Sequence, residues 1–487
     1  MIKPIYLRLI KYILFFYVIL FLFSLWQRMP HLDDAWLGEQ AYWMAKLGYV
    51  KSELFRGLIR HEERVLIHHK LLTFQGALLI KVFGFSIYIL KSLSLIYFIL
   101  FSYLYYYYLV VYKKLLTKNE FLFALLILFV NPNIFTFSFV FRPEILIMTY
   151  GFLSFIFIEK LLLNPKIQIN AFLGGLFAGL CIATHLNGVV FILVGGILLL
   201  INKKITQLLL FGLGAIITTA IYFLDFSSQY GLDFWQYQMN NNPTINVAVG
   251  SSLFKQFIFN LLNEHQRYFH GSKEIFFSVL FLISLIFSFK WIRNNNKIIL
   301  NYLFYLVLFL GFLAVHKTSK YSIVILPYFV IVIILSIKHI IDQKNKIKTI
   351  SIIVIGIIYL LVSTYYNVFL TIENKDIVAE NKMIVAKYKI PIESKIIAPM
   401  YFIFNEIEKF PHIQSELYYQ ELKKSDTLIK GEYFLNMAEL NDIDYIILSK
   451  DYIDCFDFDT ILKGKQFINY QVIDKTDNYM VFSKIKK

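Results

Sequence analysis

The sequence predicts a polytopic α-helical membrane protein with a small α/β domain at its C-terminal end. The first observation is composition: 58% of the 487 residues are hydrophobic and the mean hydropathy is +0.60, more apolar surface than a water-soluble protein can bury. The second is that long apolar runs alternate with short charged segments up to about residue 370. The third is a drop in hydrophobicity after that point, where short strand-like runs alternate with helix-like ones; the strand-like runs are 395–399, 445–449 and 479–483.

The apolar runs predict about eleven transmembrane helices. The first run has no small-residue cleavage site, so we expect a retained anchor rather than a removed signal peptide. The expected spans are residues 9–26, 86–111, 120–137, 145–163, 170–185, 188–201, 205–224, 273–290, 298–315, 321–337 and 349–370.

The net charge of +15 is explained by membrane topology. If the N-terminus lies in the cytoplasm, six basic clusters fall on the cytoplasmic side, as the positive-inside rule predicts, and a nucleic-acid partner is not needed. Cys181 and Cys455 then lie in different compartments, so we expect no disulfide. The clusters are Lys3, Arg8 and Lys11; Lys113, Lys114 and Lys118; Lys160 and Lys166; Lys203 and Lys204; Lys290, Arg293 and Lys297; and Lys338, Lys344, Lys346 and Lys348.

The same register places the remaining polar segments on the outer side. A membrane domain, residues 1–370, carries a long first outer loop at 27–85 and another outer loop at 226–272. The first loop contains two helix-like stretches, 34–47 and 68–83, which end before Gly48 and Gly84. We expect both helices to lie in the membrane interface. Residues 371–487 then form a periplasmic α/β domain of ordinary size.

Asp33 and Asp34 follow the first span directly. One aspartate is explained as the N-cap of the next helix, but the second is not. Ionisable groups at the membrane edge favour a functional interpretation. A carboxylate near its usual pKa of about 3.9 is ionised and can act as a general base.

Arg142 and Glu144 flank Pro143 at another outer helix end. A helix start predicts the proline and the glutamate but not the arginine. The planar fork of an arginine suits a phosphate, and we expect Arg142 to contact a lipid phosphate or a sugar.

Several histidines and lysines are also predicted on the outer side. His69 and Lys70 open the second interfacial helix, either as a snorkelling basic pair or as a phosphate contact. The segment with His316, Lys317, Lys320 and Tyr321 breaks the basic-inside pattern, and binding a polyprenyl phosphate would explain it. His185 lies between two short spans, where a polar helix-terminal turn and a substrate contact are the alternatives.

In their order, these motifs resemble those of the GT-C glycosyltransferases, particularly the bacterial relatives of protein O-mannosyltransferases and of lipid A aminoarabinose transferases. Asp33 and Asp34 match the acidic pair that this family carries in its first outer loop. Lys70 matches the lysine that opens its interfacial helix, and Phe83-Gly84 matches the Phe-Gly at the end of that helix.

Later motifs extend the resemblance to about residue 370. Phe141 to Glu144 is similar to the family's Ala-Arg-x-Asp/Glu element. Gly175 to His185 resembles its Gly-rich helix, with histidine where lysine is common, and Lys320-Tyr321 through Pro327 resembles its Lys-Tyr…Pro helix.

The resemblance implies an inverting hexosyl or pentosyl transferase in the bacterial inner membrane. The donor would be a polyprenyl-phosphate sugar with its lipid tail between helices, and the acceptor a glycan, a lipid or a protein. No nucleotide motif is present, and the need for a divalent metal stays open. The implied roles are general base for Asp33 with Asp34 in support, positioning for Arg142 and Glu144, and neutralisation of the donor phosphate for Lys70, Lys317 and Lys320.

Two other classes of function compete with this hypothesis. A transporter or flippase of lipid-linked sugars would also place charges near lipid, but typically at the bilayer midplane and with internal repeats. A structural or assembly protein would use the C-terminal domain as a binding module, which leaves the acidic pair unexplained.

Overall fold

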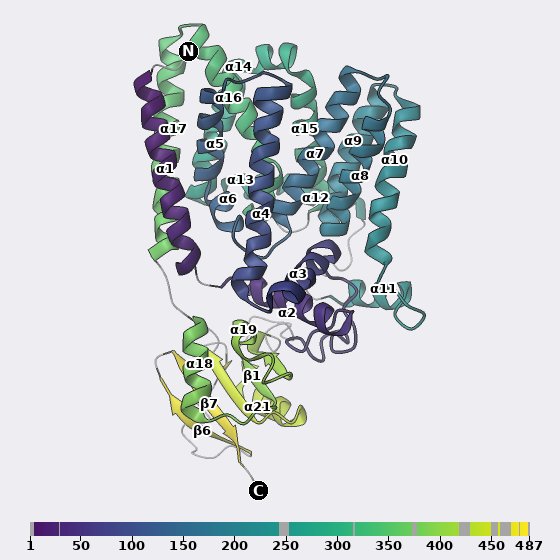
Figure 1. Cartoon of the computed structure of the whole chain (residues 1–487), viewed down its shortest axis with the longest axis vertical. Helices are drawn as coiled ribbons and strands as arrows, with labels where there is room; N and C mark the ends of the chain where they lie inside the picture. Colours follow the sequence, from purple (N-terminus) through teal and green to yellow (C-terminus); the bar gives the residue numbers. More distant parts are fainter. Residues whose placement is uncertain are drawn as a thin grey trace.

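A helical bundle and a small sheet domain divide the chain (Figure 1). The computed structural model describes residues 4–28, 30–242, 253–314, 317–372, 377–417, 429–449, 456–457, 469–476 and 478–485. The start of the chain lies at one end of the bundle, and the sheet domain lies beyond the other end (Figure 1).

The described helices of the bundle follow the predicted spans. Six stretches are long and apolar enough to cross a membrane, and α8, α9 and α15 are shorter apolar helices. The predicted span 120–137 is broken into two helices, because Pro132 has no N–H with which to continue the first. The bundle helices are α1 (Pro4–Gln27), α4 (Ile87–Tyr106), α5 (Lys118–Val130), α6 (Pro132–Phe137), α7 (Glu144–Leu163), α8 (Ile169–Thr184), α9 (Val189–Ile201), α10 (Ile205–Thr219), α14 (Ser272–Asn295), α15 (Lys297–Leu313), α16 (Leu326–Asp342) and α17 (Lys346–Ile372).

Two helices of the segment between α1 and α4 lie across the end of the bundle nearest the sheet domain (Figure 1). They are α2 (Leu32–Leu47) and α3 (Lys70–Phe83), close to the predicted stretches. Each ends at a glycine with positive φ, 78° at Gly48 and 86° at Gly84, a conformation that glycine adopts without strain.

Short helical segments connect these elements. The described ones are η1 (Tyr107–Tyr112), η2 (Leu186–Gly188), η3 (Ala220–Phe223), α11 (Leu232–Asn241), α12 (Leu253–Leu262), α13 (Gln266–Phe269) and η4 (Ser319–Val324).

Glycines let α8 and α10 touch along their length. A Cβ atom at Gly175 would lie 1.8 Å from the carbonyl oxygen of Phe211, and one at Gly214 would lie 2.2 Å from that of Phe172. Gly179, four residues after Gly175 on α8, lies against α10 in the same way: a Cβ atom there would be 2.4 Å from the carbonyl oxygen of Ala215. Small residues four apart allow this close backbone approach in membranes, so the Gly-rich motif has a packing role.

The C-terminal domain is a mixed α/β unit, as its sequence pattern predicts. The described strands form a five-stranded sheet in the order β2-β1-β4-β7-β6, in which β1 is parallel to β2 and β4, and β7 is antiparallel to β4 and β6. The domain consists of α18 (Ile377–Tyr388), β1 (Ile396–Ala398), η5 (Met400–Phe402), α19 (Ile403–Glu406), β2 (Ile413–Ser415), β3 (Ile429–Lys430), α21 (Gly431–Leu440), β4 (Tyr445–Ser449), β5 (Phe456–Asp457), β6 (Tyr470–Lys475) and β7 (Tyr479–Lys484).

The edge of this sheet is hydrogen-bonded to the loop between α2 and α3. The backbone N–H of Ser415 in β2 donates to the carbonyl of Leu54 at 2.9 Å. The side-chain amide of Gln414 donates to the carbonyl of Arg56 at 3.0 Å. The loop therefore covers a sheet edge that would otherwise be open, and both parts belong to the same side of the bundle.

The α8–α10 contact gives a stability prediction. Gly175→Ala should lower the free energy of unfolding by about 2–3 kcal/mol, because the new methyl group meets a backbone carbonyl that cannot move aside alone. Gly212→Ala is the matched control on α10: a methyl group there would have no atom within 4 Å, so a helix-favouring gain of up to about 1 kcal/mol is expected. Thermal unfolding in detergent measures both, and equal stability of the two variants would contradict the packing role.

Candidate functional site

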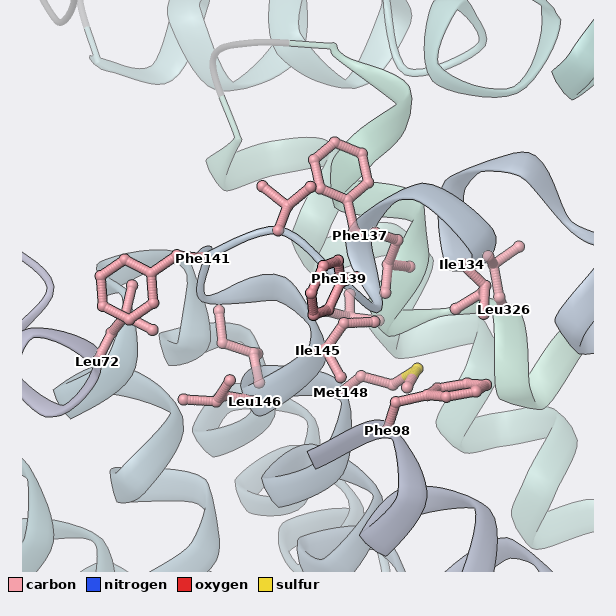
Figure 2. Close-up of a cluster of buried hydrophobic side chains, with 14 of the residues drawn as sticks. Leu72, Phe98, Ile134, Phe137, Phe139, Phe141, Ile145, Leu146, Met148 and Leu326 are labelled. Atoms are coloured by element: carbon pink, nitrogen blue, oxygen red, sulfur yellow. The ribbon is translucent and has the colours of Figure 1, made fainter. Parts of the chain in front are cut away.

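The turn between α6 and α7 is the base of the candidate site. Phe137, Phe139 and Phe141 are buried along this turn. Figure 2 shows Phe141 beside Leu72 of α3, and Phe139 near Ile145 of α7. Aromatic side chains thus fix the backbone on both sides of the turn, and Arg142 projects from a rigid segment.

Asp34 joins this turn to α2 and α4. Its carboxylate is fully buried and accepts the N–H of Phe141 at 2.6 Å and the N–H of His31 at 2.9 Å. The ammonium group of Lys91, on α4, lies 3.3 Å from the same carboxylate. Asp34 therefore has a structural role that the sequence did not reveal. It is also not the N-cap: α2 begins at Leu32, with His31 capping it.

Asp33 lies at the surface of this arrangement. Its side chain is 22% exposed, hydrogen-bonds to Arg142 and lies 3.2 Å from Nδ1 of His31. Arg142 also holds Glu144, with 2.6 Å between the guanidinium and the carboxylate. The structure thus brings together the acidic pair and the Arg-Pro-Glu motif, which are 109 residues apart in sequence.

Three imidazole rings, those of His31, His69 and His185, lie near the ion pairs that join Asp33, Arg142 and Glu144. The ring of His69 stacks on that of His185, with centroids 4.7 Å apart, and the edge of His185 meets Tyr321 at 5.7 Å. Burial lowers the pKa of His69 to about 4 and that of His31 to about 4, and it lowers the pKa of His185 well below its usual value. All three rings are therefore neutral at pH 7 and contribute no charge to the site.

Lys320 supplies the remaining positive charge. It lies close enough to Arg142 and Glu144 for their charges to interact, and burial, with a contribution from Arg142, lowers the pKa of Lys320. An amide hydrogen bond from Asn133 to the carbonyl of Ser319, 3.4 Å long, holds its turn against α6. Within the described ranges, Lys320 forms no ion pair with a carboxylate, so its charge is available to an anion.

Lys70 points to a different cluster. Its ammonium group is 2.7 Å and 2.8 Å from the carboxylate oxygens of Asp225, which also accepts from His68 at 2.9 Å. Burial lowers the pKa of Lys70 to about 8. Burial would raise the pKa of Asp225, but the hydrogen bond from His68 and the charge of Lys70 lower it to about 2. The charge of Lys70 is thus already balanced, and its predicted role toward a phosphate stays a prediction.

Lys317 also has a partner inside the protein. It contacts Glu264 and the carbonyl of Gly311, each at 2.9 Å. Fully buried Arg267 binds the same Glu264 at 2.6 Å and donates to the carbonyl of Thr318 at 3.0 Å. This network anchors the residues just before η4, the turn that carries Lys320, hereafter the Lys320 turn. It also gives Lys317 a partner inside the protein.

One predicted site residue lies outside the described ranges, and three residues near the site were not predicted. His316 lies outside the described residues. Asp225, Glu264 and Arg267 organise the surroundings of the site. The sequence signal for Glu264 and Arg267 was only the polarity of the loop 226–272, and Asp225, directly before that loop, gave no signal. In the part of the chain that the structure describes, no group of three or more His, Cys, Asp or Glu side chains is arranged to hold a metal ion.

Comparisons with known proteins address the fold. No family model and no curated protein sequence matches the chain. The solved structure of ArnT from Cupriavidus metallidurans in the apo state matches with a TM-score of 0.58 at 10% identity, covering 98% of each chain. The chain has the GT-C fold. The same ArnT bound to undecaprenyl phosphate matches with a TM-score of 0.56, at 10% identity and with 98% of each chain covered.

An archaeal enzyme shares this GT-C fold. The Archaeoglobus fulgidus oligosaccharyltransferase in the apo form matches with a TM-score of 0.53 at 10% identity, covering 96% of this chain and 73% of that chain. The predicted fold class, a helical membrane domain followed by a small α/β domain, is confirmed.

Asp34 provides a test of how the site is held. Asp34→Asn should destabilise the protein by about 3–5 kcal/mol, because buried Lys91 loses its counter-ion and an amide N–H₂ would face the N–H of His31. Asp442→Asn is the control: this exposed aspartate pairs with Lys395 and Lys484, and such pairs contribute about 1 kcal/mol or less. Unfolding in detergent measures both, and a native-like Asp34→Asn protein would mean that Asp34 is not the structural link.

Proposed function

We propose that the chain is an integral-membrane glycosyltransferase that moves a sugar from a polyprenyl-phosphate donor to an acceptor on the outer face of the bacterial inner membrane. One observation carries the proposal. A partly exposed carboxylate, Asp33, is fixed by Arg142, which Glu144 holds in turn. The charge of Lys320 interacts with Arg142 and Glu144, and Lys320 has no carboxylate partner among the described residues. This arrangement lies where α2 covers the end of the bundle nearest the C-terminal domain (Figure 1).

Asp33 is proposed as the general base. An acceptor hydroxyl would lose its proton to the carboxylate as its oxygen attacks the anomeric carbon, and the bond from that carbon to the phosphate oxygen would break with inversion. The ion pair with Arg142 fixes the direction of the Asp33 carboxylate, and its exposed edge leaves room for the acceptor.

Lys320 is proposed to receive the departing phosphate. Negative charge grows on the phosphate as the glycosidic bond breaks, so a nearby cation stabilises the transition state more than the ground state. Arg142 and Glu144 would position the sugar or the acceptor through their remaining donors and acceptors. His69, His185 and Tyr321 offer neutral ring surfaces at the same place.

The comparisons support the kind of donor. ArnT has been solved bound to undecaprenyl phosphate, and AglB from Archaeoglobus fulgidus with an inhibitory peptide and a dolichol-phosphate. We propose the outer orientation because the six basic clusters named in the sequence analysis would then be cytoplasmic. Residues 371–487 would be periplasmic. A flippase would need no fixed carboxylate beside a phosphate-binding cation, so transfer activity separates the two hypotheses.

Asp33→Asn tests the base directly. The variant keeps the size of the side chain but lowers its basicity, so we expect transfer to fall by about a hundredfold or more while the protein folds and inserts normally. Transfer can be followed with purified protein, lipid-linked sugar and cell-envelope acceptors analysed by mass spectrometry. Asp233→Asn, an exposed aspartate of α11, is the control and should retain full turnover. Normal turnover of the Asp33→Asn protein would exclude Asp33 as the base.

Lys320 and Lys317 make a matched pair for the phosphate contact. Lys320→Met should raise the KM for the lipid-phosphate donor and lower kcat, with little change in stability, because Lys320 pairs with no carboxylate among the described residues. Lys317→Met should mainly lower stability, because it leaves Glu264 with one cation fewer. Kinetics and thermal unfolding of both variants measure the difference. Unchanged donor kinetics in Lys320→Met would remove Lys320 from the site.

A further inference from the structure

A long apolar cavity lies between α14 and α15, apart from the site at Asp33. Its volume is about 620 Å³, within the range of ligand pockets. Phe329 of α16 also lines it, and its apolar walls include Phe281, Leu285, Leu303 and Val307. Such walls offer a hydrocarbon chain many contacts and a polar ligand few.

The cavity follows nearly the whole length of α14. Its lining includes Tyr268 and Phe269, just before the helix, and reaches Arg293 in the last turn. A helix of 24 residues is about 36 Å long, and the hydrocarbon core of a bilayer is about 30 Å thick. The cavity is therefore a groove that crosses one leaflet and continues into the other.

The two ends of the groove differ in chemistry. Arg293 and Lys297 line the end far from the Asp33 site, with Asn301 one turn further along α15. Neither Arg293 nor Lys297 forms an ion pair with a carboxylate among the described residues. The lining contains no acidic side chain, so the positive charge at this end is uncompensated.

We propose that the groove holds an anionic phospholipid from the leaflet on the Arg293 side. Its phosphate would lie between Arg293 and Lys297, and its acyl chains would run along α14 and α15. Basic pockets between transmembrane helices on the cytoplasmic side suit anionic headgroups, because the cations attract the phosphate while the helices bury the chains. The proposal does not depend on the glycosyltransferase activity.

This lipid is distinct from the sugar donor. The start of α14 adjoins the Lys320 turn, since the side chain of Arg267 lies over the ring of Tyr321 at 5.7 Å. Arg293 is 21 residues beyond Ser272, or about 32 Å along the helix. A phosphate that contacts Arg293 and Lys297 therefore cannot also contact Lys320.

The test measures lipid retention by the full-length protein in detergent. Native mass spectrometry with added phosphatidylglycerol or phosphatidylcholine gives the two affinities. We expect the unmodified protein to retain phosphatidylglycerol preferentially, and the Arg293→Gln/Lys297→Gln protein to bind it roughly 30-fold more weakly. Lys290→Gln/Lys346→Gln is the control: it removes the same charge from the same side, but neither residue lines the groove.

A second variant tests the apolar part of the groove. Val307→Trp fills the space for the acyl chains while leaving every charge in place, so phosphatidylglycerol retention should fall with Arg293 and Lys297 intact. Equal binding of the two phospholipids, an equal loss in the control, or displacement of phosphatidylglycerol by undecaprenyl phosphate would each overturn the proposal. None of these results depends on sugar transfer, so the proposed function is tested separately.

Discussion

The buried carboxylate of Asp34 is the interaction on which the candidate site depends. The N–H of Phe141, the N–H of His31 and the ammonium group of Lys91 meet at its two oxygen atoms. An ionised group with no exposed surface is stable only when it is paired and hydrogen-bonded, so these three parts of the chain have one favourable arrangement. Because Arg142 follows Phe141 directly, the same hydrogen bond sets the direction of the guanidinium that holds Asp33 and Glu144.

The membrane imposes a second constraint on the bundle. Helices surrounded by lipid gain little from hydrophobic association, so α8 and α10 associate through close contact at Gly175, Gly179 and Gly214. Thr218 adds a hydrogen bond to the carbonyl of Leu176 at 2.8 Å. This rigid pair ends at His185, whose ring stacks on His69 of α3. Packing in the membrane and the position of a ring at the site are therefore linked.

Much of the fold could be predicted from the sequence because its determinants are local. The lengths of the apolar runs predicted the bundle helices, and Gly48 and Gly84 marked the ends of α2 and α3. The strand-like runs near residues 396, 445 and 479 correspond to β1, β4 and β7. The motif order also indicated the GT-C fold. Helix breaks such as the one at Pro132 moved boundaries without changing this architecture.

Pairing across long distances could not be predicted. The sequence suggested that two adjacent aspartates share one task, whereas the backbone turns one inward to Lys91 and the other outward to Arg142. It also grouped Lys70, Lys317 and Lys320 as phosphate ligands. Asp225 and Glu264 pair with the first two of these lysines. Glu264 comes from a loop whose polar residues showed no pattern, and Asp225 lies directly before that loop.

These pairings decide which lysine can act on a phosphate. A carboxylate bound to a lysine largely cancels the electrostatic field of the ammonium group. Lys70 and Lys317 are both paired in this way. At the Asp33 site, two carboxylates and two cations balance when the imidazoles are neutral. A sugar-linked phosphodiester would bring one negative charge, and its departure as a monoester would bring a second. Lys320 is the cation at this site that no carboxylate holds among the described residues, so it is the group whose interaction with the phosphate can strengthen as transfer proceeds.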